Sequence, residues 1–339
     1  MASRLRLPLL LVLWLALAAL GVTLAVRFSG VPAAELGRLL VLPAPTAALL
    51  AVFCAGLYAS DAVRYRLLGD AVGTPLGWRT AFETSIANYF FGWVTPGGAF
   101  GAPAAVVMLA RRGVPWDAAA VIAFGKSITG TAFLLLLAFA AFAAGIGPAF
   151  GSGVRWTLAV GTGVVVVMLA VPMIAAFFPR RSLASIDRIE RRLGGGEAPR
   201  VVLAVARGLR DTVERLARLR SGGLALVLKL TAANVAFYVA FVGVAVVLAM
   251  TFGAESWLKA TGVSAVFLAF SYVAPTPGGA GLAEATAVIF YGSLLPPPEA
   301  VAVVLLSRAL TFYLQVAVGM IYLPIAGGVG EILAYRDRQ

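Results

Sequence analysis

The chain has 339 residues, of which 61% are hydrophobic and only 12% are charged, whereas a soluble globular domain carries roughly 25% charged residues. It has no histidine and a single cysteine, Cys54, which excludes internal disulfides, Ser-His-Asp triads, Cys-His nucleophiles and histidine-ligated zinc, so we expect no cofactor and no metal. The formal net charge of +12 is spread over short segments between apolar runs, which indicates an anionic lipid surface as partner and not a nucleic acid.

Six apolar runs are long enough to form transmembrane helices, since a bilayer core of about 30 Å needs about 20 helical residues. The first of them follows Arg4 and Arg6 and could be a cleaved signal peptide, but its length and the runs that follow favour a retained anchor. The six runs are residues 7–26, 43–60, 118–145, 156–178, 224–252 and 299–326.

Two further apolar stretches, residues 80–110 and 261–295, are interrupted near their centres by residues 95–101 and 275–281. Proline removes a backbone donor and glycine permits positive φ, so neither stretch can run as one straight helix. Irregular backbone at membrane depth is tolerated only where protein or a water-filled cavity surrounds it. We therefore predict that each stretch is a re-entrant helical hairpin.

The basic residues predict the orientation, because cytoplasmic loops carry an excess of Lys and Arg. With the N-terminus in the cytoplasm, the outer segments hold only Arg27, Arg38, Arg155 and Lys259. The predicted architecture is a single all-α transmembrane domain over residues 1–339, with about six full spans, two re-entrant hairpins, and both termini inside a bacterial cytoplasmic (inner) membrane. The cytoplasmic segments then hold Arg4, Arg6, Arg64, Arg66, Arg79, Arg111, Arg112, Lys229, Arg336, Arg338 and the region from Arg180 to Arg220.

The one sizeable polar segment, residues 179–223, is predicted to be a cytoplasmic basic amphipathic connector. Between Arg180 and Arg220 it holds eleven arginines and five acids, with apolar residues at helical spacing. Its arginines either only fix the topology or dock anionic headgroups at the inner leaflet, and the pattern leaves both open.

The two interrupted stretches share a motif. Thr95-Pro96-Gly97-Gly98-Ala99 and Thr276-Pro277-Gly278-Gly279-Ala280 are identical, and a basic residue follows each Thr after 31 or 32 residues, Lys126 and Arg308. With the preceding spans they define two repeat units, residues 43–145 and 224–326. By the orientation above the units are inverted, and paired Gly/Pro-interrupted segments in opposed halves indicate a transport site near the membrane midplane.

Charged residues inside the membrane are the next signal, because each costs roughly 2.5–3.5 kcal/mol at a helix centre. Lys126 and Arg308 either bind a substrate or reach toward the interface, and Glu284 either contacts a substrate or only pairs with Arg308. Half-helix N-termini after each turn would add N–H donors, giving two anion sites, one opening to each face. The candidate substrate-binding residues are Lys126, Glu284, Arg308, Glu83, Asn88, Thr95, Pro96, Gly97, Gly98, Thr276, Pro277, Gly278, Gly279 and Tyr272.

The run from Pro275 to Glu284 resembles the Pro-x-Pro-Gly-Gly-x-Gly-x-x-Glu signature of the lysylphosphatidylglycerol synthase transmembrane-region family, also described as a flippase-like domain. The loop at residues 64–68 and the stretch from Asn88 to Gly98 resemble its first-half features, and the similarity spans residues 7–326. It implies a role like the membrane half of the multiple peptide resistance factor, which moves aminoacylated phosphatidylglycerol to the outer leaflet. Glu284 and Arg308 carry over from that pattern, and Lys126 is the first-half counterpart.

The chain departs from this family in two ways. We expect no aminoacyl-transferase domain after Gln339 and hence no catalytic synthase, and residues 102–105 are Ala-Pro-Ala-Ala where members often carry charges.

We therefore predict a translocator of a phosphate-headed phospholipid or related lipid. The alternatives are a small-solute or ion-coupled secondary transporter and a non-catalytic accessory subunit of lipid or glycan synthesis. The predicted partners are anionic phospholipid or aminoacylated phosphatidylglycerol, with a homodimer or a separate synthase as further possibilities.

Overall fold

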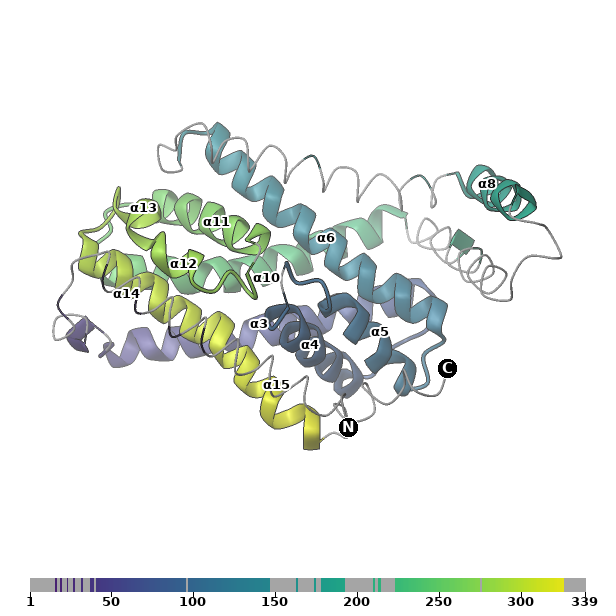
Figure 1. Cartoon of the computed structure of the whole chain (residues 1–339), viewed down its shortest axis with the longest axis horizontal. Coiled ribbons are helices and arrows are strands. Elements are labelled where there is room, and N and C mark those ends of the chain that lie inside the picture. Colours follow the sequence, from purple (N-terminus) through teal and green to yellow (C-terminus); the bar gives the residue numbers. More distant parts are fainter. Residues whose placement is uncertain are drawn as a thin grey trace.

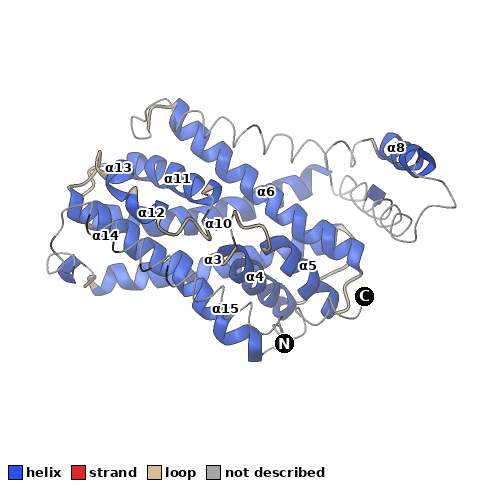
Figure 2. Cartoon of the chain, viewed as in Figure 1, coloured by secondary structure: helices blue, strands red, loops and turns tan. Residues whose placement is uncertain are grey.

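The structure, a computed structural model, describes residues 16, 19, 23, 27, 32, 37–39, 41–95, 97–146, 163, 174, 178–192, 210, 213–214, 223–274 and 276–325. Throughout these residues the chain forms helices joined by turns and loops, without strands (Figure 2). The predicted all-α class is therefore confirmed for this part of the chain. The predicted spans at residues 7–26 and 156–178, most of residues 193–222 and the predicted cytoplasmic C-terminus lie outside the described residues.

Among the described residues, four helices are long and apolar enough to cross a membrane, which supports the assignment as a membrane protein. Three are continuous: α3 (Ala44–Ala71), α6 (Trp116–Ala143) and α10 (Gly223–Thr251). The fourth consists of α14 (Pro297–Arg308), the π-helical turn η3 (Ala309–Tyr313) and α15 (Leu314–Ile325). Proline immediately precedes α3, α6 and α14, where its fixed φ and missing N–H cost nothing in hydrogen bonding.

Helix α3 is longer than the sequence predicted, and this corrects one assignment. The predicted span stopped at Ser60, and residues 64–68 were assigned to a cytoplasmic loop, but α3 continues to Ala71 and buries Arg64. Residues 61–72 contain no proline and only one glycine, so nothing in the backbone ends the helix there. The charges that ended the apolar run are buried as an ion pair between Asp61 and Arg64.

Both interrupted stretches break at the predicted motif. In the first, α4 (Trp78–Trp93) and α5 (Gly101–Arg111) are joined by a turn in which Gly97 and Gly98 have φ of 60° and 68°. In the second, α11 (Trp257–Val273) ends before a turn in which Gly278 and Gly279 have φ of 55° and 70°. L-residues rarely adopt these angles, which is why the paired glycines interrupt each helix.

The return half of the second stretch differs from the expected single half-helix. It is divided at Thr286 into α12 (Leu282–Ala285) and α13 (Ala287–Tyr291). The division leaves Glu284 in the first turn after Gly281, where its carboxylate accepts from the Gly281 N–H at 2.8 Å. That the two stretches are re-entrant hairpins remains a prediction.

The helices of the two predicted repeat units, residues 43–145 and 224–326, pack reciprocally (Figure 1). Helix α3 packs along α10, while α4 packs on α15 and α11 packs on α6. Exchanging the units converts the α4–α15 contact into the α11–α6 contact and leaves the α3–α10 contact unchanged. A two-fold relation between the units requires this pattern, and it brings the two glycine turns toward one another; the inverted orientation itself remains a prediction.

The longest described part of the connector is α8 (Pro179–Arg192), which lies away from the transmembrane helices (Figure 1). Its Asp187 pairs with Arg210 at 2.5 Å, and both side chains are well exposed. The triple glycine predicted to divide this connector, residues 194–196, lies outside the described residues. A purely connecting role and a lipid-docking role both remain predictions.

Two helix contacts give a matched test of this packing. A Cβ at Gly319 on α15 would lie 2.5 Å from Cβ of Phe90 on α4, whereas a Cβ at Gly56 on α3 would meet Ala240 of α10 at 3.5 Å. We expect Gly319→Ala to lower the free energy of unfolding by about 1–3 kcal/mol through overpacking. Gly56→Ala should not lower it, because alanine favours the helix and fits. Thermal unfolding in detergent measures both, and equal effects would contradict the α4–α15 packing.

Candidate functional site

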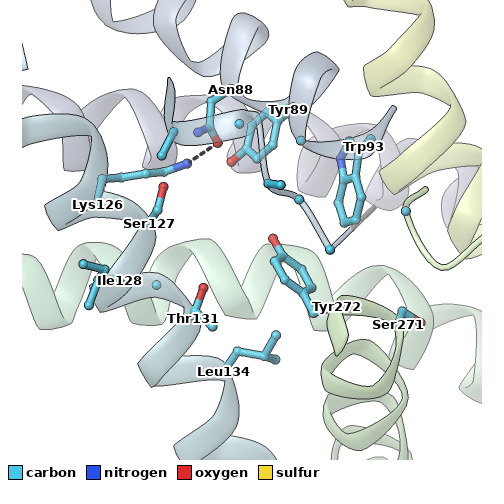
Figure 3. Close-up of a pocket in the computed structure, with 18 of the residues that line it drawn as sticks. Asn88, Tyr89, Trp93, Lys126, Ser127, Ile128, Thr131, Leu134, Ser271 and Tyr272 are labelled. Atoms are coloured by element: carbon cyan, nitrogen blue, oxygen red, sulfur yellow. Dashed lines mark hydrogen bonds between the residues drawn. The ribbon is translucent and has the colours of Figure 1, made fainter. Parts of the chain in front are cut away.

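A cavity of about 700 Å³ lies where the two glycine turns meet. Gly97 and Gly98 line it from one side and Gly278 and Gly279 from the other, with further walls from α3, α4, α6, α10 and α11 (Figure 3). Both turns therefore line one cavity. That each half also forms its own anion site, one opening to each face, stays a prediction. The side chains on its wall include Arg64, Asn88, Tyr89, Trp93, Lys126, Ser127, Thr131, Phe237, Tyr238, Ser271, Tyr272 and Thr276.

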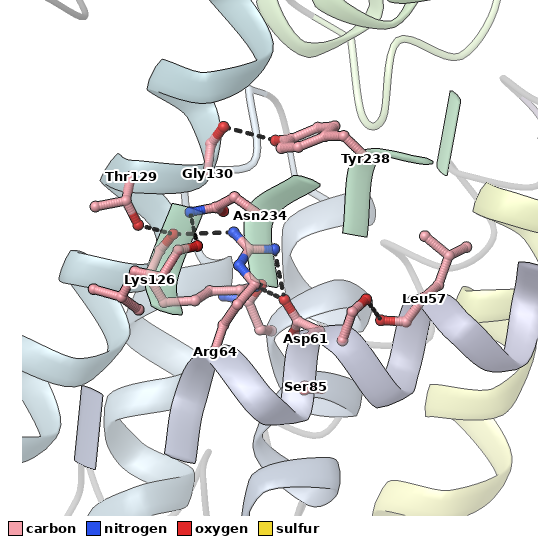
Figure 4. Close-up of polar contacts among 12 residues, drawn as sticks. Leu57, Asp61, Arg64, Ser85, Lys126, Thr129, Gly130, Asn234 and Tyr238 are labelled. Atoms are coloured by element: carbon pink, nitrogen blue, oxygen red, sulfur yellow. Dashed lines mark hydrogen bonds and ion pairs between the residues drawn. The ribbon is translucent and has the colours of Figure 1, made fainter. Parts of the chain in front are cut away.

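Two cations stand on the cavity wall, and one carboxylate lies behind them. Oδ1 of Asp61 lies 3.0 Å from Nη1 of Arg64 and 3.0 Å from Nζ of Lys126 (Figure 4). Asp61 is fully buried and does not line the cavity, whereas both cations do. A buried charge is tolerated when it is paired and hydrogen-bonded, and one aspartate oxygen here serves two cations.

Lys126 is held from several directions and does not extend to an interface. Only 4% of its surface is exposed, and Nζ donates to Oδ1 of Asn88 at 3.0 Å (Figure 3). The same ammonium lies 5.1 Å and 4.9 Å from the ring centroids of Tyr65 and Tyr89, whose faces attract a cation. Lys126 is therefore buried among protein groups, and its contact with a substrate stays a prediction.

Arg64 depends on a glycine for its place. A Cβ at Gly130 would lie 2.2 Å from Nη2 of Arg64, so any larger residue on that turn of α6 would displace the guanidinium. Nη2 donates to the carbonyl of Lys126 at 3.3 Å, and the guanidinium carbon lies 4.5 Å above the ring of Phe237. Tyr238 donates to the carbonyl of Gly130 at 2.7 Å, which fixes α10 against α6 here (Figure 4).

Three donors on this wall have no hydrogen-bond partner among the residues that the structure describes. They are Nε of Arg64, the hydroxyl of Tyr89 and the hydroxyl of Thr276. Buried donors are nearly always satisfied, by protein or by a bound group. The three atoms have almost no exposed surface in this conformation, so they would donate to a group in the cavity, such as a phosphate with its acceptor oxygens, only after a small movement of their side chains. The second oxygen of Asp61, Oδ2, also has no partner there.

Glu284 and Arg308 pair with each other behind the second turn and do not line the main cavity. Arg308 also donates from Nη2 to the carbonyl of Gly278 at 3.1 Å, and Tyr313 donates to Oε1 of Glu284 at 3.0 Å. The wider turn of η3 helps residues five apart, 308 and 313, reach one carboxylate. A Cβ at Gly278 would lie 1.8 Å from the Phe312 ring, so only glycine fits this turn. The direct substrate contact of Glu284 and Arg308 stays a prediction.

One of the N–H donors expected at each half-helix N-terminus is already used. The Gly281 N–H donates to Glu284, as described above, and α12 has only four residues. The first half begins at Gly101 on the cavity wall, with Ala102 beside it, and the Gly101 N–H donates to the carbonyl of Gly98 at 3.1 Å. That the half-helix N-termini add donors to an anion site stays a prediction.

The remaining candidates serve mainly to hold elements together. Glu83 accepts from Arg79 and Tyr322, both at 3.0 Å, and pairs with Arg112, which ties α4 and α5 to α15 away from the cavity. The Thr95 hydroxyl donates to the Phe91 carbonyl at 2.6 Å and accepts from the Phe100 N–H at 3.2 Å, which closes the first turn. Of the two motif prolines, Pro277 is buried outside the cavity lining, and Pro96 lies outside the described residues.

Sequence reasoning missed Asp61 and gave Arg64 only a topological role. Their separation of three residues places both on one face of a helix, and that spacing is the signal that could have identified them. Their contact with Lys126 joins residues more than 60 positions apart and depends on how α3 packs on α6. Asn88, Lys126, Tyr272, Thr276 and the four turn glycines, all predicted, do lie together.

Comparison with known proteins agrees with this geometry. Residues 9–319 match the family described as "Lysylphosphatidylglycerol synthase TM region". A protein of Archaeoglobus fulgidus named "UPF0104 membrane protein" is 23% identical over 269 residues, which cover 77% of this chain and 80% of that protein. The family match includes both turns and the helices α3, α6 and α10.

Removal of one partner from the buried pair of Glu284 and Arg308 should cost far more stability than removal of one partner from an exposed pair. We expect Glu284→Ala to lower the free energy of unfolding by about 3–5 kcal/mol, because Arg308 is left buried without its carboxylate. Asp187→Ala, which removes a partner of Arg210 in the exposed connector, should cost less than about 1 kcal/mol. Chemical unfolding in detergent compares them.

A double variant, Glu284→Leu with Arg308→Met, should recover most of that loss, since no unpaired charge then remains. If Glu284→Ala and Asp187→Ala cost the same, or if the double variant is no better than Glu284→Ala, the pair does not hold the second turn as described.

Proposed function

Because the chain belongs to the family of lysylphosphatidylglycerol synthase transmembrane regions, we propose that it is a lipid translocator, which moves a phosphate-headed phospholipid or related lipid between the leaflets of a bacterial inner membrane. The observation that carries this proposal is the pair of cations, Arg64 and Lys126, on the wall of a cavity formed by two broken helices. Ionisable residues inside a membrane protein mark substrate pathways, because burying them is otherwise unfavourable.

The headgroup is recognised by charge and by donors. A phosphate oxygen bound in the cavity would accept hydrogen bonds from Arg64 and Lys126. A nitrogen of each of these side chains already lies 3.0 Å from Oδ1 of Asp61. The unpartnered hydroxyls of Tyr89 and Thr276 lie on the same wall and supply further donors. Hydrogen bonds from charged donors are about twice as strong as those between neutral groups, so a few of them are enough to hold a headgroup while it is moved.

The acyl chains need an apolar exit from the cavity, and its wall provides one. Phe124 on α6 lines the cavity and is 44% exposed, and Gly97 to Ala99 of the first turn are exposed as well. A lipid could therefore place its headgroup at Lys126 while its tails stay outside in the bilayer. An opening of this kind favours a lipid over a small solute, which requires an enclosed polar pocket.

The two turns define the direction of access in this conformation. Gly97 and Gly98 are exposed, whereas Gly278 and Gly279 are buried and the carbonyl of Gly278 is held by Arg308. In the proposed cycle the headgroup enters beside the first turn. Its release on the other side requires the second turn to move, which breaks the bond between Arg308 and Gly278.

We propose transport without catalysis. The described residues of the cavity wall supply cations and hydroxyl groups but no carboxylate or histidine that could act as a general base. Holding and releasing a charged headgroup needs only the groups that are present.

Lys126 gives the sharpest test of the proposed function. In proteoliposomes that contain fluorescent phosphatidylglycerol, Lys126→Gln should slow transfer between leaflets about tenfold or more, since a hydrogen bond to a charged group contributes about 1.5–3 kcal/mol. Lys259→Gln, a matched change at an exposed lysine in the first turn of α11, should leave the rate unchanged. Quenching of the outer-leaflet fluorophore measures the rate.

Transfer by the unaltered chain no faster than in protein-free liposomes would contradict the translocator proposal. Equal rates for the unaltered chain and for correctly folded Lys126→Gln would leave translocation in place but remove Lys126 from the headgroup site.

A further inference from the structure

The charges on the cavity wall bear on which lipid the site takes. Among the described residues that line the cavity, Arg64 and Lys126 are the only charged ones, and no aspartate or glutamate accompanies them. The carboxylate that neutralises them, Asp61, is fully buried and does not line the cavity. A bound headgroup therefore meets positive groups and not the carboxylate.

The charge balance of this cluster is uneven. Asp61 offsets one of the two cations, so the cluster of Asp61, Arg64 and Lys126 carries one positive charge in excess. The other buried carboxylates of the described residues have partners of their own: Glu284 pairs with Arg308, and Glu83 pairs with Arg79 and Arg112. Neither of them offsets this excess. One added negative charge would neutralise the buried cluster, which is the most favourable state in a medium of low polarity.

From this balance we propose that the site selects headgroups with a single net negative charge, that is phosphodiesters such as phosphatidylglycerol, and disfavours the cationic lysyl ester after which the family is named. The proposal rests on the proposed function, since it names the substrate class of that same cavity. A phosphodiester brings one negative charge and several acceptor oxygens, which match the excess charge and the unpartnered donors of Arg64, Tyr89 and Thr276.

A lysyl ester would meet two obstacles. Its added ammonium groups reverse the net charge of the headgroup, and like charges at close range in this cavity repel. Two of the aromatic rings on the wall already contact cations: Tyr89 lies against Lys126, and Phe237 lies against Arg64. A zwitterionic headgroup meets the same obstacles to a smaller degree, since it brings one ammonium group and no net charge.

A panel of fluorescent lipids in the same proteoliposomes tests this selection with the unaltered chain. We expect phosphatidylglycerol to be transferred at least tenfold faster than lysylphosphatidylglycerol, with phosphatidylethanolamine between them. Equal transfer of all three, or faster transfer of the lysyl ester, would overturn the charge selection while the translocator proposal stands. Transfer of none of them would instead overturn the proposed function.

Variants that change the cluster by one charge provide a second readout. Lys126→Gln leaves the cluster neutral and should bring the rate ratio of phosphatidylglycerol to lysylphosphatidylglycerol toward one. Asp61→Asn leaves two positive charges and should shift preference toward phosphatidic acid, a phosphomonoester that can carry two negative charges. Lys259→Gln should change neither ratio. Because each readout is a ratio, a smaller folded fraction of a variant does not affect it.

A soluble phosphodiester presents the same chemistry without acyl chains, and a separate arm distinguishes the two sources. Liposomes loaded with glycerophosphoglycerol should retain it in the presence of the chain. Release of this ester without lipid transfer would assign the charge-selective site to a small solute and overturn the lipid proposal. Unchanged lipid ratios in Lys126→Gln and Asp61→Asn would overturn the role of the cluster in selection.

Discussion

A positive charge inside an apolar membrane protein has to be neutralised by a neighbouring group, and this requirement shapes both halves of the structure. Lys126 and Arg308 occupy matching positions after the two glycine turns, but they are neutralised differently. Arg308 pairs with Glu284 from the return segment that follows its own turn. Lys126 pairs with Asp61 from α3, and it shares that carboxylate with Arg64. The different arrangement of the two turns follows from this difference.

In the second unit the carboxylate is fully used. Glu284 accepts from Arg308, Tyr313 and the Gly281 N–H, while Arg308 also holds the carbonyl of Gly278. These contacts bury the turn against Phe312 and divide the return half into two short helices. In the first unit Lys126 is directed toward Asp61 and Asn88, and no cation of the described wall bonds to the turn. The first turn therefore stays exposed, and Arg64 and Lys126 remain available on the cavity wall.

How far the sequence predicts this structure depends on whether the signal is local. The Gly-Gly pairs predict both breaks because positive φ is a property of the residue itself, and Glu284 and Arg308 are recognisable from their spacing to the turn. Hydropathy does not predict where α3 ends. Asp61 and Arg64 end the apolar run, but the helix continues because the two charges pair and can be buried. The junction of both turns at one cavity depends on reciprocal packing between distant helices, which neither motif encodes alone.

The charges of the wall also explain how one scaffold could serve different lipids. Ala102 lies on the cavity wall at the start of the stretch where the family pattern often has charged residues. A carboxylate at this position would belong to the cavity wall, unlike Asp61, and would offset the excess charge of Arg64 and Lys126 there. With alanine at this position the wall keeps its positive charge, so the departure of residues 102–105 from the pattern supports the proposed preference for an anionic headgroup.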